Sequence, residues 1–402
     1  MSQINYLYHS VEPDAVNQNG YTEFSTIDFS LDFAQRAMVA GSVRFEAEVR
    51  ITDGNGADIA DIAKVKCDHM VGGHSFVQSC VSSTLNSGIL ENATNLPRLH
   101  AMKVNSTEHY NDMNNAKNVC ELKSSDTFLQ EKLLKQRCPS DLGGGANGVG
   151  AGQHLGSGFG DATLYPRPVN DGAFENPDFS IKPDIVFNNV VSSNKLVNYS
   201  TTGTVKLSFN LARNAEALFG ASMTAGHSYT LTNARVCFVS LPEQPKQAPV
   251  QLRSSICLKS NLNSNLASSS IRVPNICDSV SISFLSLARE NSLFFNNTAL
   301  EKPPNFDALR MNFNSSTNKY LAYELKTIPE IVGEGLKSLA NGSGSNNVSL
   351  DKLAVNKGFI AGLKFGEFVD LSKQSFQIQV QSGIQNANPM VMFSYFHSLI
   401  AL

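Results

Sequence analysis

Four side chains of the types that bind zinc stand close together in the chain: Cys67, His69, His74 and Cys80. Thiolate and imidazole groups are the usual ligands of structural zinc sites, but the spacing of these four residues matches no common zinc motif. If residues 65–80 form strands, Cys67 and His69 share one face only while a break at Gly72-Gly73 persists. We therefore interpret the four as core and loop residues and assign no metal ligand.

A glycine-rich stretch carries the letters of the dinucleotide-binding fingerprint. Residues 143–148 read Gly-Gly-Gly-Ala-Asn-Gly. The fingerprint needs a strand before it and a helix after it, so that a phosphate meets the helix N-terminus. Here Arg137-Cys138-Pro139-Ser140 precedes the stretch and more glycine follows it. We assign no cofactor-binding residue.

No residue pattern indicates nucleophilic or acid–base catalysis. The chain has no Gly-x-Ser-x-Gly elbow. His227 and His397 lie in or beside predicted strands, where a hydrogen-bonded structural histidine is the preferred interpretation, and Asp28 and Asp32 lie on the polar face of a strand. We assign no catalytic residue and expect no enzyme. A β-sandwich glycoside hydrolase stays open as a less favoured alternative, because its two acids would be distant in sequence.

Alternation of apolar and polar residues dominates the rest of the chain and predicts strands. In the final stretch Phe376, Ile378 and Val380 alternate with glutamines, as a half-buried antiparallel strand requires. Similar signals predict strands at residues 26–33, 43–51, 185–191, 205–211, 229–239, 254–272, 280–284 and 309–313, one or two within 65–83, and closing strands from 358 onward. The fold class is therefore all-β.

Helices and loops interrupt this pattern at a few places. Pro97 suits a first helical turn, residues 126–137 carry an apolar stripe, and Thr327-Ile328-Pro329-Glu330 reads as a capping box. Residues 143–160 are too rich in glycine to build a core, so we expect an extended surface loop there. Three prolines within 241–249 favour a stiff connection, which predicts a nearly fixed orientation of the two halves.

Composition excludes several classes of protein. The net charge of −3 and pI of about 6.3 give no electrostatic reason for nucleic-acid binding, and neither end carries a basic arm. We see no secretory signal and no apolar run long enough to span a bilayer. The 7 cysteines are odd in number and scattered, which favours buried thiols.

The two halves repeat one order of strands, a short helix, a loop and closing strands. In this the chain resembles the double jelly-roll major capsid proteins of tailless icosahedral phages, adenoviruses and large DNA viruses. The stretches that carry the resemblance are 24–51, 204–242, 280–313 and 358–402. It implies two consecutive jelly-roll β-sandwiches with short helices and long inter-strand loops, and residues 246–402 would be the second roll. Residues 1–245 would be the first, with a glycine-rich loop insertion at about 142–165.

The resemblance also implies a role and partners. It predicts a homotrimer whose six rolls form a pseudo-hexagonal capsomer that tiles an icosahedral shell, with outward towers or inter-tile loops at 142–160 and 290–305. The partners would be the chain itself, neighbouring capsomers, minor capsid or vertex proteins and an internal membrane, with no sequence-specific nucleic-acid binding. The protein would be made in soluble form in the host cell and end in the virion. The alternative is a vertex, spike or receptor-binding virion protein, which the lack of Trp disfavours.

Overall fold

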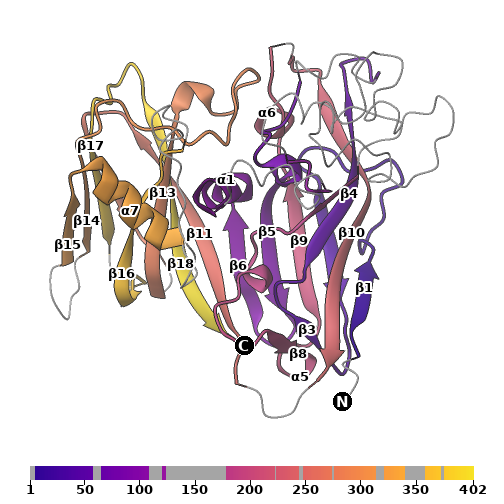
Figure 1. The fold of residues 1–402 in the computed structure, drawn as a ribbon. Coiled ribbons are helices and arrows are strands. Elements are labelled where there is room, and N and C mark those ends of the chain that lie inside the picture. The colour runs from indigo at the N-terminus through magenta and orange to yellow at the C-terminus, as the bar shows by residue number, and fades with distance from the viewer. Residues whose placement is uncertain are drawn as a thin grey trace, which may run out of the picture.

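The computed structural model of this 402-residue chain consists mainly of antiparallel strands. It describes residues 5–57, 65–107, 120–123, 178–221, 223–243, 248–273, 276–313, 321–339, 358–372 and 375–402. Figure 1 shows two β-sandwiches standing side by side, built from the N-terminal and C-terminal parts of the chain.

The first sandwich contains two sheets. Its strands are β1 (Leu7–Val11), β2 (Thr26–Leu31), β3 (Arg36–Val39), β4 (Arg44–Thr52), β5 (Val77–Thr84), β6 (Gly88–Thr94), β7 (Asp178–Ile181), β8 (Leu196–Asn198), β9 (Val205–Leu211) and β10 (Ser228–Pro242). One sheet has the order β7-β4-β10-β3-β8, with β1 also paired to β10, and the other has the order β2-β9-β5-β6.

The second sandwich contains two sheets of four strands. Its strands are β11 (Gln251–Leu262), β12 (Leu266–Ile271), β13 (Ile276–Ser286), β14 (Ala308–Phe313), β15 (Leu321–Leu325), β16 (Ala361–Asp370), β17 (Phe376–Gln381) and β18 (Met390–Ala401). The sheet orders are β11-β18-β13-β16 and β12-β17-β14-β15.

Both sandwiches follow the same strand order. When the short strands β3 and β8 are set aside, the eight remaining strands of the first sandwich pair in the orders β1-β10-β4-β7 and β2-β9-β5-β6. Numbered along the chain, these are 1-8-3-6 and 2-7-4-5, which are also the orders in the second sandwich. Each sandwich is thus an eight-stranded jelly roll. The expected fold class is confirmed.

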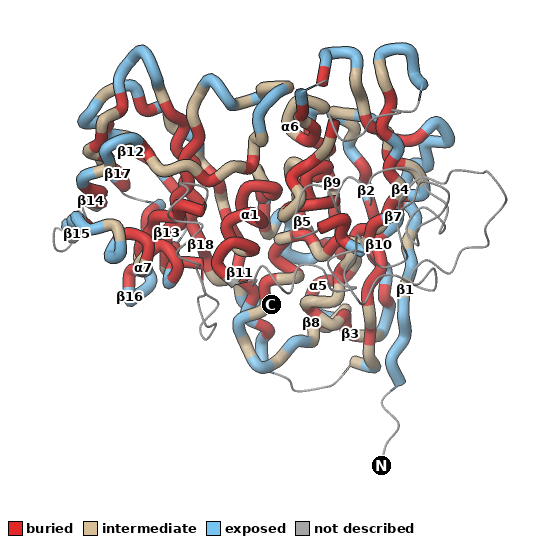
Figure 2. Tube along the Cα trace, turned by 45° about the horizontal axis from the view of Figure 1, so that its top comes forward, coloured by how far each residue is buried: buried red, intermediate tan, exposed pale blue. Residues whose placement is uncertain are grey.

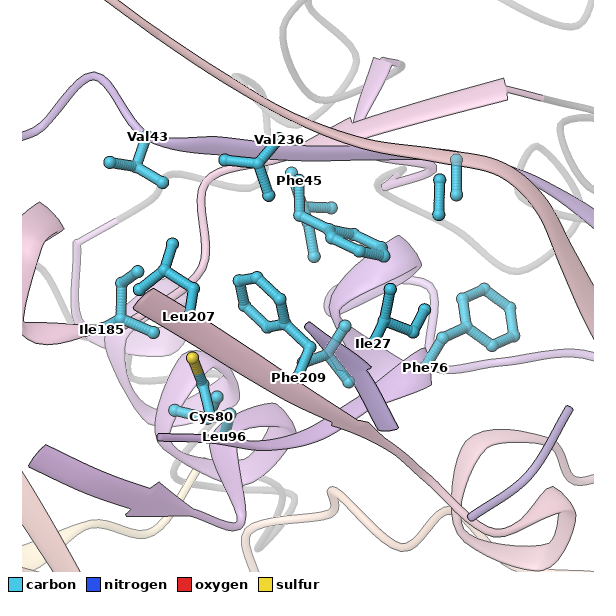
Figure 3. Close-up of a cluster of buried hydrophobic side chains, with 14 of the residues drawn as sticks. Ile27, Val43, Phe45, Phe76, Cys80, Leu96, Ile185, Leu207, Phe209 and Val236 are labelled. Carbon is cyan, nitrogen blue, oxygen red and sulfur yellow. The ribbon is translucent and has the colours of Figure 1, made fainter. Parts of the chain in front are cut away.

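Alternating side chains fill the space between the sheets of each roll. In the first roll Phe29, Phe45 and Phe209 are fully buried and meet edge to face or tilted, with ring centroids 5.1–6.2 Å apart. Figure 3 shows the side chains of Phe45 and Phe209 converging from different strands. With no Trp in the chain, Phe carries most of the aromatic packing of the core.

The longer described helices are α1 (Leu96–Thr107) and α7 (Ile328–Leu339), and shorter ones are η2 (Gly72–Phe76), η5 (Val186–Asn188), α5 (Tyr199–Thr202), α6 (Asn214–Ala217) and η6 (Leu287–Arg289). At α7 the hydroxyl of Thr327 accepts a hydrogen bond from the backbone N–H of Glu330, as predicted for the helix cap. No helix within the described ranges is both long and apolar enough to cross a membrane.

Of the one or two strands predicted within 65–83, the structure has one, β5. Residues 65–71 form no regular strand, because the chain there turns into η2 after a single bridge between Lys66 and Phe219. The strand prediction at 185–191 is wrong. This stretch contains η5 (Val186–Asn188) and a single bridge from Val190 to Leu252, although Ile185, Val186 and Phe187 are buried as their apolar character demands. The predicted helix at 126–137, the loop at 143–160 and linker residues 244–247 lie outside the described residues.

Candidate functional site

The structure does not gather the four zinc-type residues that stand close together in the sequence. Cys67 and Cys80 are buried in the apolar core of the first roll. His69 lies near the surface, its ring 31% exposed and 3.8 Å from the carboxylate of Asp68. His74 is also buried, on η2, and faces two residues from other parts of the chain.

His74, His100 and Glu121 form a buried cluster that sequence spacing could not reveal. The imidazole rings of His74 (on η2) and His100 (on α1) stack with centroids 3.5 Å apart. The Nε2 atom of His74 is 3.7 Å from Oε2 of Glu121. The ligand-type atoms of the three residues all lie within 4.8 Å of one another. We call this set the His–His–Glu cluster.

Charged side chains surround the His–His–Glu cluster. Asp184 receives a 2.6 Å hydrogen bond at Oδ2 from Nδ1 of His100, and Lys103 donates to its other oxygen at 2.7 Å. Nζ of Lys123 is 2.7 Å from Oε2 of Glu121. Burial lowers the pKa of His74 and lowers that of His100 to about 3, so both rings are neutral near pH 7.

The other residues weighed for catalysis lie apart from this cluster. His397 on β18 is buried, and its two ring nitrogens are hydrogen-bonded to the hydroxyls of Ser255 and Ser281 at 2.9 and 2.8 Å. Nδ1 of His227 bonds to Thr224 in the turn before β10. Asp28 and Asp32 are exposed. The glycine stretch 143–148 lies outside the described residues.

A buried arginine at the start of α1 ties the first roll to the second. Arg98 is only 4% exposed, and its guanidinium lies over the ring of Phe393 on β18, 4.2 Å from the centroid. It donates to the backbone carbonyls of Ala299, at 2.8 Å, and Asn297. One side chain of the first roll thereby fixes both a strand and a long loop of the second.

A buried carboxylate joins the rolls at another point. Oε1 of Glu91 on β6 accepts the backbone N–H of Ser255 on β11 at 2.8 Å, and Oε2 accepts that of Val186 at 2.6 Å. Burial raises the pKa of Glu91 to about 8, against the lowering effect of these two hydrogen bonds.

Backbone pairing and apolar packing also cross the joint. The N–H of Arg253 donates to the carbonyl of Asn189 at 2.7 Å, and Val190 and Leu252 form a β-bridge. Leu99 and Met102 of α1 pack into the apolar core of the second roll. In Figure 2 the buried trace continues from the first roll through α1 and β11 into the second. The two rolls therefore form one block.

Exposed aromatic side chains gather around α6 at one end of the molecule. Phe24, Phe294 and Phe295 are 64%, 60% and 47% exposed. Arg213, at the N-cap of α6, lies over the ring of Phe24, and the loop with Phe294 and Phe295 bonds to the same region through the Gly220 N–H and the Leu293 carbonyl. We call these three residues the phenylalanine patch. Both rolls contribute to it.

A polar pocket of about 440 Å³ opens on the second roll. Charged, amide, hydroxyl and small residues dominate its lining, which consists of Asn265, Leu266, Asn305, Asp307, Arg310, Gln381, Ser382 and Gly383. Gln381 bonds to both Asp307, at 2.5 Å, and Arg310, at 3.0 Å. The pocket therefore contains both hydrogen-bond donors and hydrogen-bond acceptors.

No protein-family model and no curated protein sequence matches the chain. Solved structures match it in fold along its full length. The Faustovirus major capsid protein superposes with a TM-score of 0.51 at 10% identity, covering 100% of this chain and 91% of its own. The PBCV-1 virus capsid gives 0.52 at 8% identity (100% and 95% covered). A chain of the Sputnik virophage gives 0.51 at 10% identity (99% and 85% covered).

At such low identity the likeness concerns the fold. It extends over both rolls and their order in the chain, so the resemblance to double jelly-roll major capsid proteins is confirmed at the level of architecture.

Proposed function

We propose that this chain is the major capsid protein of an icosahedral virus and forms a homotrimer, a pseudo-hexagonal capsomer made of six jelly rolls. The observation that carries the proposal is the repetition of one eight-stranded order in two rolls along the chain. A trimer of subunits with two similar rolls each contains six rolls, so its outline has nearly sixfold symmetry. The whole-length match to a viral major capsid protein supports the same role.

The contacts between the two rolls support a role that requires a rigid subunit. A shell tile must keep its shape under pressure from neighbours and contents. Arg98 and Glu91 join the rolls from buried positions, and backbone bonds run beside them. Buried polar groups with their partners in place favour a single arrangement of the rolls. We propose residues 1–245 as the first roll and residues 246–402 as the second.

The phenylalanine patch supports self-association at the end that carries α6. Three exposed phenylalanine side chains, on segments that all contact the region of α6, provide apolar surface of the kind found at interaction sites. We place a contact between subunits of the trimer there, with the loop at 290–305 taking part. The internal membrane, minor capsid proteins and vertex proteins remain further proposed partners, and we propose no enzymatic activity.

The polar pocket of the second roll favours a second candidate, a vertex or receptor-binding virion protein. Asp307, Arg310 and Gln381 present donors and acceptors of the kind that orient a sugar. Protein copy number in purified particles separates the candidates. We expect this chain to be the most abundant shell protein, and a copy number that matches only the vertices would favour the second candidate.

A further inference from the structure

We propose that the His–His–Glu cluster binds a divalent first-row transition metal, with Zn²⁺ as the natural occupant. The ligands would be Nε2 of His74, Nε2 of His100 and the carboxylate of Glu121, with a water molecule in a fourth position. This site is separate from the capsid role and does not depend on it.

Two unpartnered nitrogen atoms point to a ligand. Nε2 of His74 and Nε2 of His100 are both buried, and neither has a hydrogen-bond partner among the residues that the structure describes. Their side chains are 5% and 11% exposed. Buried polar atoms in native proteins almost always have a partner, so two such orphans beside one carboxylate need an explanation. A metal ion satisfies both nitrogen atoms at once.

The surroundings of His100 prepare its Nε2 atom for coordination. Asp184 accepts the hydrogen bond from Nδ1, at 2.6 Å, so in the neutral ring Nδ1 carries the proton and Nε2 has a bare lone pair. A carboxylate on the far nitrogen is the usual arrangement behind a metal-binding histidine, since it fixes the tautomer and the ring orientation.

The backbone that brings Glu121 to the two histidines adopts two unusual conformations. Gly72 has φ +58°, and a Cβ there would lie 2.2 Å from the carbonyl oxygen of Glu121, so only glycine fits. The N–H of Gly73 donates to that same oxygen at 2.8 Å. Leu122 takes a left-handed φ of 57°, which is uncommon for a leucine. This segment is held against η2 in a way that a metal ligand would explain.

Binding requires a modest rearrangement. A tetrahedral site with bonds of about 2.0–2.1 Å holds its ligand atoms roughly 3.4 Å apart. The present atoms lie within 4.8 Å, so the side chains must close in, and the rings of His74 and His100 must turn out of their stack. Two imidazoles and one carboxylate, with Lys103 and Lys123 beside them, disfavour Ca²⁺ and Mg²⁺, which prefer oxygen ligands.

The test measures metal bound to the full-length protein as purified, because a buried site is filled during folding. Cells grown with added zinc should give one zinc ion per chain, and cells grown with cobalt should give a protein with the visible absorption of Co²⁺ bound by nitrogen and oxygen. Zinc content should fall about tenfold or more in His74→Ala and His100→Ala. His69→Ala is the matched control from the same segment and should keep its zinc.

Glu121→Gln is the variant of nearly unchanged shape, for use if an alanine variant does not fold. It should also lose zinc while keeping the circular dichroism spectrum of the wild type. Wild-type protein without zinc and without a cobalt spectrum would overturn the proposal, as would loss of zinc in His69→Ala. In those cases the cluster is a polar part of the core.

Discussion

Single buried polar residues carry much of the specificity of this fold. Arg98 and His397 each have a pair of hydrogen-bonding partners from distant parts of the sequence, and each is almost inaccessible to solvent. Such groups contribute little net free energy when satisfied, but leaving one partner alone is costly. Substitution of these residues should therefore lower the free energy of unfolding more than substitution of surface residues of the same type.

Replacing Arg98 with Met should lower the free energy of unfolding by about 2–4 kcal/mol, because buried carbonyls of the 290–305 loop lose their donor. Chemical denaturation of both proteins measures the difference. Lys337→Met is the control, since Lys337 is 62% exposed and its pair with Glu334 is worth little. Equal losses in the two variants would show that Arg98 has no special role at the joint.

His397 should make the protein sensitive to acid. Burial holds the pKa of His397 well below its usual value. Below about pH 6.5 the histidine is therefore protonated in the unfolded chain but stays neutral in the folded protein. Its contribution is present above that pH and is lost as pH falls, by up to about 1.4 kcal/mol per pH unit. Denaturation between pH 7 and 5 should show a shallower fall for His397→Gln than for the wild type, and parallel curves would contradict this.

At the scale of elements, alternation in the sequence located most strands but not their irregular neighbours. Strands β2, β4, β9, β10, β14 and β17 lie where the pattern predicted them. The apolar runs at 65–71 and 185–191 are buried as irregular chain, because burial alone does not distinguish a strand from a packed turn. The short edge strands β1 and β15 had no clear alternation and were not predicted.

The polar sites were out of reach of the sequence for a different reason. His74, His100 and Glu121 come from three elements whose approach depends on the packing of α1 against η2. The spacing of these residues along the chain does not show that they meet in the fold. The sequence offered Cys67 and His69 as neighbours of His74, and the fold separates them.

Glu91 gives the joint between β6 and β11 its own pH dependence. With its pKa raised to about 8, the folded protein retains a proton that the unfolded chain releases above about pH 4.5. The contribution of Glu91 to stability should therefore decline as pH rises from about 5 to about 8. The gap in unfolding free energy between wild type and Glu91→Gln should shrink over this range, and a gap that stays constant would show that Glu91 is ionised throughout.

At the scale of the whole molecule, two similar rolls held as one block suit the proposed role of a shell tile. The exposed features that matter for this proposal are those that would meet other subunits. The phenylalanine patch lies at the end near α6, while the exposed residues Leu85 and Ile89 belong to the β5–β6 hairpin near α5, at the opposite end of the first roll (Figure 1).

The double variant Phe294→Ser and Phe295→Ser should weaken the trimer, because it removes exposed aromatic area from the proposed contact. The expected loss is about tenfold or more in the trimer association constant, measured by analytical ultracentrifugation over a range of concentrations. The pair Leu85→Ser and Ile89→Ser should leave association unchanged. The reverse ranking would move the contact to the other end of the roll.

The native mass of the recombinant protein is the decisive measurement for the proposed role, since a shell tile must associate with copies of itself. We expect a stable species of three times 43.5 kDa at micromolar concentration. A clean monomer under these conditions would contradict it.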